Sequence, residues 1–176
     1  FNTAMTKTNT KEIGFEEFIE NELVAKHGYH IRSPRDNYDK KHAMDTELVL
    51  EFVRTTQPEE WKQIEEQYGA DAPERFLARV DEEIESQGLL NVLREGVKDR
   101  GVTIRLAHFQ PQTGMNPEAQ KDFDANILSV VRQLKYSEQN ENSIDVVLFI
   151  NGLPLFTAEL KNQFTGQNVL NAVRQY

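Results

Sequence analysis

Hydrophobic residues recur at helical spacing through most of the N-terminal half of the chain. The first such segment, residues 13–26, carries apolar residues three or four positions apart, at Phe15, Phe18, Ile19 and Leu23. Glutamates fill most of the other positions of this segment: Glu16, Glu17, Glu20 and Glu22. We therefore predict an amphipathic helix that ends near Gly28.

Further helices follow, each marked by its own start or stop residue. Asp45 or Thr46 caps a helix whose apolar positions are Leu48, Val49, Phe52 and Val53. Pro58 opens the next helix as its first residue. Another helix is indicated by Phe76, Leu77, Val80 and Ile84, and a short one, "LLNVLREG", comes after Gly88. The first hundred residues are thus predicted to be mostly helical.

The pattern changes to strands after Gly101. "VTIRLAHF" alternates like a strand, "PEAQKDFDAN" is a candidate short helix, and "ILSVVRQLKYS", "IDVVLFI" and "LPLFTAELK" form a predicted three-stranded meander. The last two strands join at Asn151-Gly152, a dipeptide that favours a hairpin. A final helix is predicted at "QNVLNAVRQY". The fold class is α/β, with a central mixed sheet, flanking helices and a helical insertion in the N-terminal half.

Composition limits the possible roles of this chain. Its 176 residues are typical of one domain, and 38% hydrophobic with 28% charged residues is a globular composition. No apolar run approaches the roughly 18 residues of a membrane span, and zero cysteines exclude disulfides and thiolate metal sites. We expect a cytoplasmic protein with no membrane partner. The formal charge of −9 argues against a domain that holds nucleic acid mainly through phosphate contacts, so another component should deliver any DNA.

Three charged residues interrupt the predicted hairpin "SIDVVLFINGLPLFTAELK": Asp145, Glu159 and Lys161. Strand alternation puts Glu159 and Lys161 on one face, about 7 Å apart. A plain two-residue turn would leave Asp145 on the other face. A three-residue connection, with Gly152 in the left-handed conformation of a bulge, would set Asp145 opposite Glu159. We predict the three-residue connection.

An Asp and a Glu that converge beside a Lys suit a hard divalent cation such as Mg²⁺, which takes oxygen ligands from carboxylates and substrate phosphate. Such a site serves phosphodiester hydrolysis, because the metal polarises the phosphoryl oxygen and activates a water, while the Lys orients that water or stabilises the developing charge. The structural alternative is a turn-capping Asp and a solvated Glu-Lys pair of small energetic value.

The spacing of Asp145, thirteen intervening residues and then Glu159-Leu160-Lys161 resembles the PD-(D/E)XK nuclease signature. The likeness extends through "RQLKYSEQNENSIDVVLFINGLPLFTAELKNQFTGQNVLNAVRQY", "YDKKHAMDTELVLEFVRTTQPEEW" and "LLNVLREGVKDRGVTIRLAHFQP". Over about residues 13–176 the chain resembles the N-terminal nuclease domain of the R (restriction, motor) subunit of type I restriction-modification enzymes. This likeness implies a restriction-endonuclease-like fold.

The resemblance also implies roles for individual residues. Asp145 and Glu159 would bind Mg²⁺, and Lys161 would be the catalytic lysine. Glu16 falls where related nucleases often place another carboxylate near the metal, although Glu17 or Glu20 is an alternative.

Other positions follow the family pattern less closely. Family members often carry a Gln and a Tyr four apart after the lysine; Tyr176 fits, but Ala172 stands at the Gln position and Gln175 is the candidate substitute. Ile144 replaces the Pro of the signature. No GKT/S phosphate-binding motif is present, so the ATP-driven motor lies outside this sequence.

The implied activity is Mg²⁺-dependent and ATP-dependent cleavage of double-stranded DNA by a complex with methyltransferase (M) and specificity (S) subunits. We expect residues 1–12 to be a disordered or vector-derived N-terminus and residues 13–176 to be the nuclease domain, a fragment of a longer subunit. In isolation it should cut DNA weakly or not at all. The competing hypothesis is a nuclease-fold docking or regulatory module whose metal site is inactive or incomplete.

Overall fold

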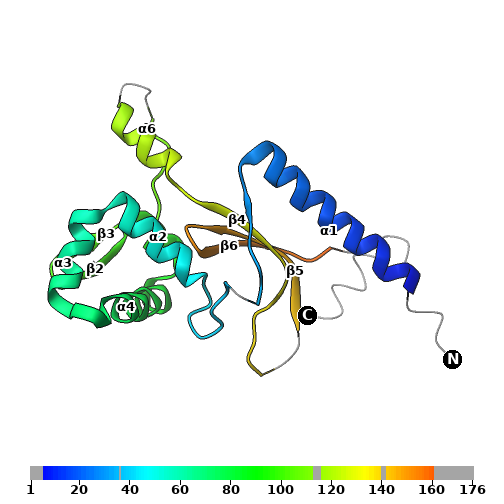
Figure 1. The fold of residues 1–176 in the computed structure, drawn as a ribbon, viewed down its shortest axis with the longest axis horizontal. Coiled ribbons are helices and arrows are strands. Elements are labelled where there is room, and N and C mark those ends of the chain that lie inside the picture. Colours follow the sequence, from blue (N-terminus) through cyan, green and yellow to red (C-terminus); the bar gives the residue numbers. More distant parts are fainter. Residues whose placement is uncertain (1–5, 36, 113–115, 140–141, 161–176) are drawn as a thin grey trace.

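The computed structural model describes residues 6–35, 37–112, 116–139 and 142–160, and it confirms a mixed α/β fold (Figure 1). Its helices are α1 (Thr6–His27), α2 (Thr46–Thr56), α3 (Pro58–Tyr68), α4 (Ala72–Gln87), α5 (Leu89–Glu95) and α6 (Pro117–Asp124), with a 3₁₀ turn at Gly69–Asp71. Its strands are β1 (His30–Ile31), β2 (Val97–Asp99), β3 (Val102–Ile104), β4 (Leu128–Lys135), β5 (Ser143–Ile150) and β6 (Leu153–Ala158). The final helix expected at 166–176 lies outside the described residues. None of the described helices is both long and apolar enough to cross a membrane.

The central sheet has the strand order β1-β4-β5-β6. The antiparallel meander β4-β5-β6 confirms the predicted three-stranded unit, while the short β1 adds a parallel edge that the sequence did not indicate. The strand expected at "VTIRLAHF" is only partly confirmed, because β3 ends at Ile104 and pairs with β2 in a separate two-stranded sheet. Beyond Ile104, side-chain amides take the place of a strand neighbour: Gln57 bonds the backbone N–H and C=O of Arg105, and Asn126 bonds those of His108.

The helical insertion agrees closely with the sequence pattern. Asp45 caps α2 by accepting a hydrogen bond from the Leu48 N–H, and Pro58 is the first residue of α3. Helices α2, α3 and α4 gather with β2 and β3 at one end of the central sheet (Figure 1). The large core lies here, and Trp61, only 4% exposed, packs edge-on against Phe76 within it.

Helix α1 ends at His27, as expected, but it begins at Thr6, seven residues before the predicted start at residue 13. Its buried side also differs from its predicted apolar side. Phe15 and Phe18 are 53% and 58% exposed, whereas Glu16 and Glu20 are buried. An amphipathic helix normally buries its apolar stripe. The amphipathic interpretation is therefore only partly confirmed: Ile19 and Leu23 are half-buried beside the two carboxylates, whereas the two phenylalanine rings are exposed.

The turn of the β5–β6 hairpin is hydrogen-bonded to the start of the helical insertion. Both turn residues have positive φ, 50° at Asn151 and 83° at Gly152, as a two-residue hairpin turn of the Asn-Gly type requires. The Asp45 N–H donates to the Gly152 carbonyl over 2.8 Å, so the start of α2 rests on the turn. The buried Asn151 side chain bonds the Ile127 N–H and the Leu106 carbonyl.

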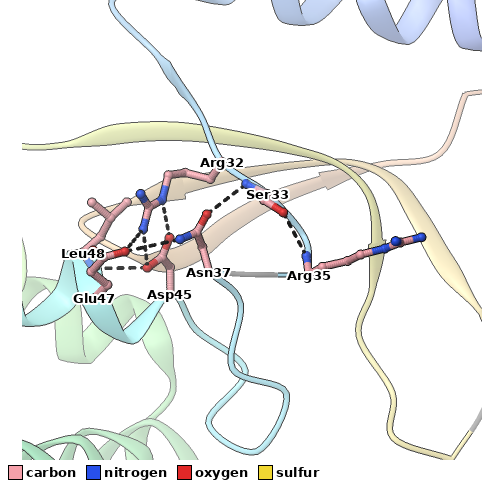
Figure 2. Close-up of polar contacts among 7 residues, drawn as sticks. All are labelled: Arg32, Ser33, Arg35, Asn37, Asp45, Glu47 and Leu48. Carbon is pink, nitrogen blue, oxygen red and sulfur yellow. Dashed lines mark hydrogen bonds and ion pairs between the residues drawn. The ribbon is translucent and has the colours of Figure 1, made fainter.

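An ion-pair cluster holds the end of β1 to the same place (Figure 2). Arg32 makes two bonds to the Asp45 carboxylate, at 2.8 and 3.2 Å, and a third to Glu47 at 2.5 Å. The hydrogen bonding that Arg32 donates to Asp45 is the main cause that raises the pKa of Arg32 above its usual range, so the guanidinium stays charged. Asp45 thus caps α2, binds β1 and supports the hairpin turn, which fixes the strands that carry the candidate site.

Candidate functional site

The register of β5 and β6 decides whether Asp145 can face Glu159. The turn is a plain two-residue turn with Ile150 opposite Leu153, so the predicted three-residue connection is wrong. A bulge further along β6 supplies the missing shift: Leu148 pairs with Phe156 but Phe149 pairs with Pro154, which leaves Leu155 as the extra residue.

Beyond the bulge the pairing is shifted by one residue. Val146 stands opposite Ala158, and continuing this register by one residue puts Asp145 opposite Glu159. A bulge within the strand, rather than at the turn, therefore gives the register that the hypothesis required, although the observed ladder ends at the Val146–Ala158 pair.

The Asp145 carboxylate accepts hydrogen bonds from two donors, one in β4 and one just after β6. Its Oδ2 accepts the backbone N–H of Leu160 over 2.7 Å, and its Oδ1 accepts the side-chain Nε2 of Gln133 in β4 over 3.2 Å. The Leu160 bond ties the carboxylate to the backbone between Glu159 and Lys161. Asp145 is half-buried, and Glu159 is exposed at the end of β6.

Helix α1 brings Glu16 to the same point. The Gln133 Nε2 that bonds Asp145 also donates to Glu16 Oε1 over 2.8 Å, so one nitrogen joins two carboxylates from elements that are far apart in the sequence. The two candidate alternatives on α1 are engaged elsewhere: Glu20 pairs with Arg132 at 3.0 Å and Glu17 lies 3.8 Å from the same side chain. Of the three glutamates, Glu16 is the one bonded to a residue that also contacts Asp145.

Some of the expected residues are not brought together. Within the described parts of the chain, no three acidic or histidine side chains are grouped closely enough to hold a metal ion. The proposed catalytic Lys161, together with Ala172, Gln175 and Tyr176, lies outside the described residues.

Gln133 is the residue of this site that the sequence analysis missed. It sits in the predicted strand "ILSVVRQLKYS", where an exposed polar residue carries no particular signal. Its distinguishing feature is conformational, since its φ of 51° is left-handed although it is neither Gly nor Asn. The sequence gives no means of predicting that conformation.

The sequence was also compared with known protein families. Residues 10–176 match the family model described as "Type I restriction enzyme R protein N terminus (HSDR_N)". The chain belongs to this family. The match covers nearly the whole chain and confirms the resemblance inferred from the hairpin and its flanking segments. No curated protein and no solved structure matches the chain.

Proposed function

We propose that this HSDR_N chain is the Mg²⁺-dependent endonuclease domain of a type I restriction enzyme R subunit, with Asp145, Glu159 and Lys161 as its catalytic residues. The observation that carries the proposal is the shared hydrogen bonding of Asp145 and Glu16 to one Gln133 nitrogen, next to the strand end that leads to Glu159. Membership in a family of restriction enzymes supports DNA cleavage as the reaction, and so does the sequence spacing of Asp145 and Glu159.

The carboxylate oxygens beside Gln133 are suitable ligands for a hard divalent cation. Two bonds of 2.8 and 3.2 Å to one nitrogen put the Glu16 and Asp145 oxygens no more than about 6 Å apart. Carboxylate oxygens are the ligands that Mg²⁺ prefers, and one or two of them with substrate phosphate are a usual set. Glu16, Asp145 and Glu159 would hold the cation, which when bound supplies charge that polarises the phosphoryl group and activates a water.

The residues around the cation divide the remaining work. The Leu160 N–H donates to one Asp145 oxygen, which gives the carboxylate a defined direction. Lys161, the next residue, would orient the attacking water or stabilise the charge that develops on the phosphoryl oxygens. Tyr176 and Gln175 are assigned an accessory role in contacting DNA.

A hollow beside the site supports DNA as the substrate. It has a volume of about 820 Å³, and Arg35, Lys40, Lys135 and Gln133 are among its lining residues. The Arg35 side chain points away from the Arg32 cluster (Figure 2), and Lys40 Nζ is bonded to a neutral backbone carbonyl, that of Ser137.

Two acidic side chains also line this hollow beside the three basic ones, so its lining keeps a small positive formal charge. Asp39 Oδ1 already accepts the backbone N–H groups of Lys41 and His42, and Glu138 is the other acid. The Tyr38 hydroxyl, protonated at neutral pH like any tyrosine, is a further donor here, and burial raises its pKa. A phosphodiester backbone in this hollow would pass beside Gln133, which bonds the Glu16 and Asp145 carboxylates.

The proposed complex explains how an acidic domain meets DNA. With a net charge of −9 the chain attracts little DNA by itself. As the nuclease part of an R subunit it would receive DNA from the ATP-driven motor domains and from the M and S subunits. It would work in the cytoplasm, where those partners assemble.

The test is ATP-dependent cleavage of circular duplex DNA by the complete complex with Asp145→Asn, Lys161→Ala or a control, Asp124→Asn, in the R subunit. Asp124 lies at the end of α6, away from the carboxylate pair. We expect both site variants to lose cleavage by at least about 10²-fold, the scale of removing one charge-stabilising group, while ATP hydrolysis and the control stay unchanged. Unaltered cleavage by Asp145→Asn would refute the assignment.

A second candidate function is a docking or regulatory module, and one observation favours it: the described residues hold no preformed group of three acidic or histidine ligands. In that case the site variants would cleave normally, and another subunit or domain would carry the nuclease. The same cleavage assay separates the two functions.

A further inference from the structure

Gln133 is fixed by three hydrogen bonds although its side chain is exposed. Its Nε2 donates to Glu16 Oε1 at 2.8 Å and to Asp145 Oδ1 at 3.2 Å, and its Oε1 accepts the Ser143 hydroxyl at 3.0 Å. An exposed glutamine loses considerable rotamer freedom when it is held in this way. These contacts therefore hold one side chain in a single place between two carboxylates.

The backbone at Gln133 is adapted to this placement. The neighbouring residues Arg132 and Gln133 both contact α1, through Glu20 and Glu16, whereas regular strand alternation would point them to opposite faces. The left-handed φ of 51° breaks the alternation and allows both contacts. The ladder between β4 and β5 has Arg132 opposite Val146 and Leu134 opposite Ile144 but no pair at Gln133 itself.

This conformation has a cost. A non-glycine residue in the left-handed region is strained, and such strain persists where the surroundings demand it, often at functional sites. At Gln133 the left-handed backbone coincides with the hydrogen bonds of the side-chain amide to Glu16 and Asp145.

Two carboxylates that share one site repel each other when no cation is present. A neutral amide donor offsets part of this repulsion. Because it carries no net charge, it does not repel a metal ion, and a cation can replace it between the carboxylates. The two oxygens bonded by Gln133 are also ones that the cation of the proposed function would require.

We propose that Gln133 is a positioning residue that holds the place of the cation: its amide keeps Glu16 and Asp145 together in the metal-free protein and gives up both bonds when a divalent cation binds. This inference rests on the proposed function. Ser143 keeps hold of the displaced amide, since the bond to Gln133 Oε1 does not involve either carboxylate.

The experiment is calorimetric titration of Mn²⁺ into the complete R subunit without ATP. Gln133→Leu removes the amide at similar size, Gln133→Lys puts a fixed cation at the same point, and Gln120→Leu is the matched control. The control also removes a glutamine that bonds a carboxylate, that of Asp124 in α6, over 2.8 Å.

We expect Gln133→Leu to bind Mn²⁺ about tenfold more tightly than the native subunit, the factor that corresponds to about 1.4 kcal/mol, because the cation no longer displaces two hydrogen bonds. Gln133→Lys should weaken binding by at least about tenfold, since its ammonium competes for the same oxygens, and Gln120→Leu should not change it. A merely structural glutamine would give equal or weaker binding in Gln133→Leu, and this result would overturn the inference. Native-like binding by Gln133→Lys would also overturn it.

The titration separates this inference from the proposed function. Asp145→Asn should abolish the binding if the metal site is correctly assigned. If Asp145→Asn abolishes binding but Gln133→Leu leaves it unchanged, only the role of Gln133 is wrong. If Asp145→Asn binds Mn²⁺ like the native subunit, the proposed metal site itself is wrong.

Discussion

Replacing Gly152 with alanine tests the support of the hairpin that carries Asp145. A Cβ added at Gly152 would lie 2.3 Å from the Asp45 carbonyl oxygen and 2.8 Å from the backbone N of Val49. Both are backbone atoms at the start of α2, so neither can turn aside like a flexible side chain. The start of α2 and the turn would have to separate.

The expected loss has three parts. An alanine at a φ of 83° costs about 1–2 kcal/mol. Separation breaks the bond from the Asp45 N–H to the Gly152 carbonyl, which contributes about 0.5–1.5 kcal/mol. It also weakens the Asp45 cap of α2, which contributes about 0.5–2 kcal/mol. Gly152→Ala should therefore lower the free energy of unfolding by about 2–5.5 kcal/mol.

Gly101→Ala is the matched control for this change. Gly101 has a similar φ of 87°, but an added Cβ there meets nothing within 4 Å. It should lose only the conformational part, about 1–2 kcal/mol. Urea denaturation of both variants, followed by circular dichroism, measures the difference. Equal losses in the two variants would refute the close approach between the turn and α2.

Three further predictions concern other parts of the molecule. Phe18→Ser should change the free energy of unfolding by less than about 0.5 kcal/mol because Phe18 is 58% exposed; a loss of 3 kcal/mol or more, about the scale of a core phenylalanine, would contradict the observed orientation of α1. Burial lowers the pKa of His108 below its ordinary value of about 6.5, so the unfolded chain binds that proton more readily than the folded chain. The free energy of unfolding should therefore fall as the pH drops through about 6.5, and urea denaturation at several pH values should show a smaller fall for His108→Phe. Equal falls in the two proteins would contradict this. The double variant Arg35→Ala/Lys40→Ala in the R subunit should reduce the slope of log affinity for duplex DNA against log salt concentration by about 2. The control Lys62→Ala, at an exposed position of α3, should leave this slope unchanged. An unchanged slope in the double variant would show that DNA does not bind in the hollow.

The helical insertion was the most predictable part of the chain because its signals are local. The Asp45 cap, the first-turn Pro58 and the apolar spacing of α2 all lie within a few residues of the helix that they specify. The meander was predictable for the same reason, since alternation and the Asn-Gly turn are short-range features. Local patterns describe such elements well because their own residues supply the main interactions.

The orientation of α1 depended on distant partners and was not predictable in this way. Glu16 and Glu20 can be buried because Gln133 and Arg132, more than a hundred residues later, bond their carboxylates. No spacing within α1 reveals those partners. The apolar residues Phe15 and Phe18 were assigned to the interior because burial is usually decided by hydrophobicity, and here a polar network decided it.

The candidate site was predictable in its residues but not in its geometry. The charge pattern pointed to Asp145 and Glu159, and the register shift toward their alignment comes from a bulge at Leu155, next to Pro154. A proline within a strand signals an edge or a bulge, so Pro154 was the local mark that could have located this shift. No residue marks the left-handed conformation of Gln133, which a local pattern does not encode.

Anomalous diffraction from crystals of the protein grown with Mn²⁺ shows whether the Asp145 and Glu159 carboxylates meet at a divalent cation. We expect an anomalous peak at bonding distance, about 2.0–2.2 Å, from oxygens of Asp145 and Glu159, with the amide of Gln133 displaced from Asp145. A Mn²⁺ peak elsewhere on the protein, or no peak at these carboxylates at millimolar Mn²⁺, would contradict it.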